Sequence, residues 1–174
     1  HLLSADLSDM EARLESHPWV ARATARRDLP DKLFLSITEH RAVAYVVLDD
    51  LMLVNADGAP FAVASPQDDL DIPIVTGLPP SAFDTDKSAA HARSDLRAAV
   101  NLSRLYDTLG LTSRWPIGEV RVSHRRNVTL VLSGSGSEIV LGNGPYRQKL
   151  YRLEWVLEKL HQEGAVPEYV LLDS

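Results

Sequence analysis

Short apolar runs separated by turn residues occupy the sequence from Arg41 onward, and this pattern restricts the fold more than any other feature. The runs at residues 42–48 and 51–55 flank Asp49-Asp50, and Asp57-Gly58 marks a further turn. Aspartate and glycine are typical of the tight turns that join neighbouring strands. The pattern therefore predicts a β domain that is mainly antiparallel.

Two helical patterns interrupt these strands. Residues 89–109 end at Gly110, a typical helix-terminating residue, and residues 146–162 carry a leucine stripe at near-heptad spacing. Further strands are predicted at residues 72–77, 117–123, 128–133, 138–141 and 168–172. The proline at position 73 favours an edge position for the segment 72–77. The predicted fold class is α+β.

The first forty residues form a different, smaller pattern. A helix is predicted from about Ser4 or Asp6 to Ser16, capped by Ser4 or Ser8, and Pro18 ends it. Two β-like runs follow, at residues 19–28 and 32–39, joined by Leu29-Pro30-Asp31. A helix followed by a hairpin is a small α+β unit, which on its own would struggle to bury a core.

Composition and charge exclude several classes of protein. Apolar residues make up 45% of the 174 residues and charged residues 24%, which is ordinary for a globular chain. The net charge of −6 argues against a nucleic-acid-binding protein, and the lack of cysteine excludes disulfides and thiolate chemistry. No apolar run of about eighteen residues is present, so we expect no membrane span here. We interpret the chain as a soluble piece of a longer protein, without its anchor or targeting segment.

Residue patterns typical of catalysis, metal binding or cofactor binding are missing from the sequence. The six histidines are dispersed, and the serines of Gly134-Ser135-Gly136-Ser137 lie in a predicted turn, where nothing would activate a hydroxyl. Gly142-Asn143-Gly144 precedes a helix, but without the full dinucleotide pattern it indicates a plain strand-to-helix turn. We therefore predict a binding or structural protein with no cofactor and no enzymatic activity.

Several segments, in a specific order, resemble the FtsQ/DivIB family of bacterial cell-division proteins. The strongest are His17-Pro18-Trp19-Val20, the Leu29–Leu33 turn, and Glu39–Ala44, in which Ala42 stands where proline is usual. Weaker matches follow at residues 53–58 and 70–77, at 140–142 with the helix after it, and at 169–172. In the last of these, Leu171 replaces an acidic residue. The resemblance covers nearly the whole chain.

The resemblance implies an architecture and a function. Residues 1–40 would be a POTRA domain lacking its first strand and helix, and residues 41–174 the FtsQ-type β domain. The full protein would be held in the cytoplasmic membrane by one N-terminal helix, with this region extracytoplasmic and at the division septum. It would act as a non-enzymatic scaffold that binds FtsB, and through it FtsL, with other division proteins reaching the POTRA domain.

The resemblance also implies where the partner binds. We expect strand addition at the last predicted strand, beside the last helix. The predicted partner-binding residues are Arg147, Tyr151, Arg152, Trp155, Tyr169, Val170, Leu171, Leu172, Asp173 and Ser174. For Trp155, core filling is the favoured reading and an exposed partner anchor the alternative. The chain stops at Asp173-Ser174, where the family's partner-binding strand continues, so we expect part of the site to lie beyond it.

Two other functions compete with this interpretation. A POTRA-containing transport or outer-membrane assembly factor would show tandem POTRA repeats or a C-terminal β-barrel pattern, and neither is visible in the sequence. A periplasmic hydrolase would need a convergent set of polar catalytic residues, which the motifs do not supply.

Overall fold

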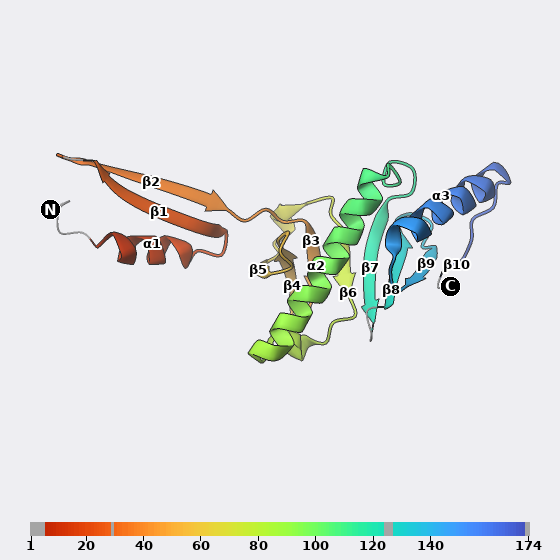
Figure 1. Cartoon of the computed structure of the whole chain (residues 1–174), viewed down its shortest axis with the longest axis horizontal. Helices are drawn as coiled ribbons and strands as arrows, with labels where there is room; N and C mark the ends of the chain where they lie inside the picture. The colour runs from red at the N-terminus through yellow and green to blue at the C-terminus, as the bar shows by residue number, and fades with distance from the viewer. Residues whose placement is uncertain (1–5, 29, 124–126, 173–174) are drawn as a thin grey trace. The chain divides into compact units, whose positions relative to one another are not determined.

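A computed structural model of the chain describes residues 6–28, 30–123 and 127–172. The chain divides into two compact units, His1–Arg41 and Ala42–Ser174. Figure 1 shows the helices and strands of both units, labelled in chain order.

The N-terminal unit is a helix followed by a hairpin. Helix α1 (Leu7–Glu15) precedes the antiparallel strands β1 (Val20–Asp28) and β2 (Lys32–Glu39). The carboxylates of Glu11 and Glu15 accept hydrogen bonds from the backbone N–H groups of Ala25 and Ala23, at 2.6 Å and 2.9 Å. These glutamates therefore satisfy N–H groups that β1, as the edge of a two-stranded sheet, would otherwise present unpaired.

The predicted serine cap of α1 is wrong. The side chain of Asp6 caps the helix, accepting hydrogen bonds from the N–H groups of Ser8 and Asp9 at 2.9 Å and 3.3 Å. Ser8 thus lies inside the first turn, and Ser4 lies outside the described residues. Aspartate is as good an N-cap as serine, and its charge also suits the positive end of the helix dipole.

The C-terminal unit is built on an eight-stranded sheet of order β10-β9-β8-β7-β6-β3-β4-β5. Its strands are β3 (Ala44–Val47), β4 (Leu51–Val54), β5 (Pro60–Val63), β6 (Ile74–Thr76), β7 (Ile117–Ser123), β8 (Asn127–Leu132), β9 (Glu138–Gly142) and β10 (Tyr169–Leu171). The pairs β3–β6, β6–β7 and β9–β10 are parallel, and the other pairs are antiparallel. The predicted α+β class is confirmed, with a sheet more mixed than the turn pattern suggested.

Strand β6 is not the edge strand that its neighbouring proline favoured. It lies inside the sheet, paired with β3 on one side and β7 on the other. Pro73 precedes the first residue of the strand, and its carbonyl accepts a hydrogen bond from the N–H of Tyr45 at 2.9 Å. Proline has no backbone N–H to donate, but its carbonyl can still accept. At this position, therefore, it removes no hydrogen bond from the sheet.

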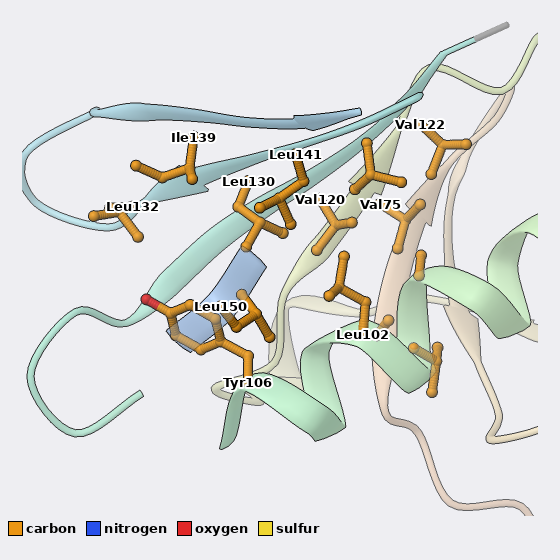
Figure 2. Close-up of a cluster of buried hydrophobic side chains, with 14 of the residues drawn as sticks. Val75, Leu102, Tyr106, Val120, Val122, Leu130, Leu132, Ile139, Leu141 and Leu150 are labelled. Atoms are coloured by element: carbon orange, nitrogen blue, oxygen red, sulfur yellow. The ribbon is translucent and has the colours of Figure 1, made fainter. Parts of the chain in front are cut away.

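Two helices cover one face of this sheet. Helix α2 (Asp86–Thr108) begins three residues before the predicted start, because Thr85 and Ser88 form a capping box. Helix α3 (Tyr146–Gln162) agrees with the predicted range. One hydrophobic core joins the helices to the inward faces of the strands, and Figure 2 shows part of it around Leu102, Tyr106, Val120, Leu130, Ile139, Leu141 and Leu150.

Tyr106 offers a test of this core. Its fully buried hydroxyl donates a hydrogen bond of 2.7 Å to the carbonyl of Trp115, which lies in the loop before β7. The substitution Tyr106→Phe removes the donor and leaves the Trp115 carbonyl without it. We expect the free energy of unfolding, measured in urea, to fall by about 1.5 kcal/mol.

The pH dependence of the same variant gives a second, independent reading. Burial raises the pKa of the Tyr106 hydroxyl above its ordinary value of 10.0. Above that pH the unfolded chain loses this proton while the folded chain retains it, so the free energy of unfolding decreases. Tyr106→Phe should weaken this alkaline decrease, and an unchanged alkaline slope would contradict the assignment.

Candidate functional site

Strand β10 forms one edge of the eight-stranded sheet. It is three residues long and runs parallel to β9. At its two ends, the Glu168 carbonyl accepts from the N–H of Glu138 at 2.9 Å, and the Leu172 N–H donates to the Val140 carbonyl at 2.8 Å. Alternate residues of a strand direct their backbone groups to opposite sides. The N–H and C=O groups of Tyr169 and Leu171 therefore point away from β9, toward the open edge.

The side chains of this edge alternate between two faces. Val170 and Leu172 face the core, where Leu172 is buried. Tyr169 and Leu171 pair laterally with Glu138 and Val140 of β9, on the opposite face of the sheet. These two side chains are 62% and 66% exposed. Large apolar side chains that stay exposed on an unpaired edge are typical of a surface that another chain covers.

A shallow apolar groove of about 430 Å³ lies between α3 and this edge. It is lined by Tyr151, Arg152, Trp155, Val156 and Leu172. The groove thus brings together predicted residues from the helix and from the last strand, which are separated in the sequence.

Trp155 is 67% exposed, so the favoured reading of this residue as core filling is wrong. The buried residues of α3 include Leu150, Leu153 and Leu157, which recur at helical spacing. Trp155 comes midway between Leu153 and Leu157, which places it on the outer side of the helix. The Lys159 ammonium lies 5.5 Å from the centroid of the Trp155 ring, within range of a cation–π interaction.

Three predicted residues remain, and the structure describes one of them, Arg147. Arg147 is exposed in the first turn of α3 and is not part of the groove lining. Asp173 and Ser174 lie outside the described residues. Val156, which lines the groove, was missed by sequence reasoning, although its position four residues after Arg152 is the signal that could have identified it.

A charged cluster extends from β7 to Glu138 of β9, the strand next to β10. Arg121 of β7 donates to the carboxylates of Glu138 and Glu119, at 2.9 Å and 3.1 Å, and Thr76 donates to Glu119 at 2.5 Å. The hydrogen bond to Glu138 is the largest cause of the raised pKa of the Arg121 guanidinium. Arg121 thus pairs with both carboxylates, and the cluster keeps one net negative charge on the sheet face beside Tyr169.

Both units match models of known protein families. Residues 1–40 match the FtsQ-type POTRA domain, and residues 44–172 match the C-terminal domain of the cell division protein FtsQ/DivIB. The chain belongs to the FtsQ/DivIB family. The resemblance seen in its sequence is thereby confirmed.

Relatives of this FtsQ/DivIB chain are cell-division proteins. It is 33% identical over its whole length to the cell division protein FtsQ of Myxococcus fulvus, and 38% identical to that of Anaeromyxobacter sp. strain K. The chain spans 60% and 58% of the length of these two proteins. Within the part of this FtsQ-family chain that the structure describes, no helix is both long enough and apolar enough to cross a membrane.

Proposed function

We propose that this FtsQ-family chain is a non-enzymatic scaffold of the division machinery, and that it docks FtsB, and through it FtsL, on the edge strand β10. One observation carries the proposal: the outward backbone groups of Tyr169 and Leu171 lie at a sheet edge that continues into the apolar groove of α3. Strand addition uses such an edge for main-chain hydrogen bonds and neighbouring pockets for side-chain specificity.

The partner segment would add a strand next to β10. Its backbone would pair with the outward N–H and C=O groups of Tyr169 and Leu171. On one face of the enlarged sheet its side chains would enter the groove beside Trp155 and Leu172, and on the other they would lie over Tyr169 and Leu171. The apolar character of both faces favours a partner strand with apolar residues at successive positions.

The role of the whole protein is part of the same proposal. Residues 1–40 are the POTRA part, and residues 41–174 are the β domain. The full-length protein is anchored in the cytoplasmic membrane by a single helix, and this region is extracytoplasmic at the division septum. The POTRA part binds other division proteins. The family match of residues 44–172 to cell-division proteins gives no support to a transport or assembly factor.

Replacing Leu171 in two ways tests whether the main chain of β10 makes the contact. Leu171→Pro removes an N–H that points outward, so the ladder to β9 keeps its bonds while the docking edge loses a donor. Leu171→Ala removes the side chain and keeps the N–H. For the FtsB extracytoplasmic segment of the same organism, we expect binding measured by calorimetry to weaken roughly tenfold with proline and about threefold with alanine.

The relative loss of FtsB binding in the two variants decides between a backbone contact and a side-chain contact. If alanine weakens binding as much as proline does, the side chain and not the backbone makes the contact, and strand addition is wrong. If both variants bind FtsB as the unchanged chain does, the docking edge lies elsewhere.

A further inference from the structure

We infer that Ser137 is a positioning residue for the docking edge: its buried hydroxyl fastens the chain entering β10 to the β8–β9 turn. The inference rests on the proposed docking at β10 and adds a residue that touches no partner. Ser137 is 2% exposed, and its Oγ donates a hydrogen bond of 2.6 Å to the carbonyl of Pro167. Pro167 is two residues before the first residue of β10.

The direction of this hydrogen bond follows from proton counting. Ser137 Oγ lies 2.9 Å from Ser135 Oγ as well as 2.6 Å from the Pro167 carbonyl. A hydroxyl has one proton, and a carbonyl oxygen can only accept. Ser137 must therefore donate to Pro167, and this shorter contact takes the proton that Ser135 Oγ could otherwise accept. Ser135 Oγ also accepts from the backbone N–H of Ser137 at 3.2 Å.

The rest of Ser137 is equally constrained. Its carbonyl accepts from the N–H of Leu132 at 3.0 Å, which closes the β8–β9 turn. With its backbone and its hydroxyl both bonded, the Ser137 side chain has a fixed direction toward Pro167. The turn Gly134–Ser137 thus has a structural role.

The position of the Ser137–Pro167 hydrogen bond explains how it can affect the register of β10. The ladder between β9 and β10 begins where Glu138 donates to the Glu168 carbonyl, at 2.9 Å. The Ser137–Pro167 hydrogen bond lies directly before it. The consecutive residues Ser137 and Glu138 therefore donate to the consecutive carbonyls of Pro167 and Glu168. A parallel strand of three residues has few ladder bonds of its own, so this additional bond is a large share of what keeps β10 in register.

Ser137→Ala tests the inference in the full 174-residue chain. We expect hydrogen exchange of the Val170 and Leu172 amides to rise roughly fivefold, while amides in β7 and β8 exchange as before. Binding of the FtsB extracytoplasmic segment should weaken by a similar factor, through faster dissociation of the complex. The matched control is Ser113→Ala, which removes a hydroxyl that donates to the Gly110 carbonyl at 2.9 Å, away from β10.

Each pattern of results has one meaning. Faster exchange confined to β10 together with faster dissociation supports Ser137 as a positioning residue. Unchanged exchange in β10, equal changes throughout the sheet, or an unchanged dissociation rate overturns it. If the unchanged chain does not bind FtsB but Ser137→Ala still speeds exchange in β10, the proposed docking fails while the fastening of the strand stands.

Discussion

Replacing Gly77 with alanine is expected to lower the free energy of unfolding by about 3 kcal/mol or more. Gly77 follows β6 with a φ of +92°, a conformation that costs other residues about 1 kcal/mol or more. A Cβ at this position would lie 2.0 Å from the carbonyl oxygen of Val122 in β7. Since the obstacle is backbone in the middle of the sheet, the β6–β7 pairing itself has to shift. Urea unfolding followed by circular dichroism measures the loss.

Gly110 provides the matched control for this prediction. It has a φ of +76°, close to that of Gly77, but a Cβ there would meet nothing within 4 Å. Gly110→Ala should therefore lower the free energy of unfolding by about 1 kcal/mol, the cost of the left-handed backbone conformation alone. Equal losses in the two variants would mean that the left-handed conformation alone matters, and that the close approach to Val122 contributes nothing.

The positions of most helices and strands could be predicted because they depend on local chemistry. Gly110 has the positive φ of a helix-terminating glycine, and Pro145 lies directly before α3. The order of the strands is a different matter. β6 pairs with β3 and with β7, which are contributed by distant parts of the chain. A proline near such a segment cannot indicate which neighbours it will have.

The candidate site was predicted only in part, because helical spacing is a local property of the sequence whereas burial depends on the whole fold. Tyr151 and Trp155 are four residues apart, so helical spacing alone places them on one side of α3. Whether that side is covered depends on the rest of the fold, and the exposure of Trp155 was therefore misjudged. Ser137 and Pro167 are thirty residues apart, and no sequence pattern links them.

Replacing Trp155 with alanine should have the largest effect on docking. Trp155 lines the groove beside Leu172 and exposes 67% of its surface, so a partner strand at β10 could bury much of the indole. Aromatic residues at the centre of an interface are commonly binding hot spots. We expect affinity for the FtsB extracytoplasmic segment, measured by calorimetry, to fall by about 2 kcal/mol, or roughly thirtyfold.

The stability of the same variant separates docking from folding. An exposed side chain contributes little to the core, and its interaction with Lys159 is of the weak, solvent-exposed kind. The free energy of unfolding should therefore change by no more than about 0.5 kcal/mol. A large loss of stability would instead mean that Trp155 supports the packing of α3, and reduced binding could then be secondary to unfolding.

Phe34→Ala in the N-terminal unit is the control for removing an exposed aromatic ring. Phe34 is 49% exposed, and the guanidinium of Arg26 lies 5.5 Å from its ring centroid, the same distance as Lys159 from Trp155. The two variants therefore lose the same kind of contact, but only Trp155 borders the groove at β10. If FtsB binding falls equally in both, the loss does not arise from that groove, and wild-type affinity in Trp155→Ala would remove Trp155 from the docking site.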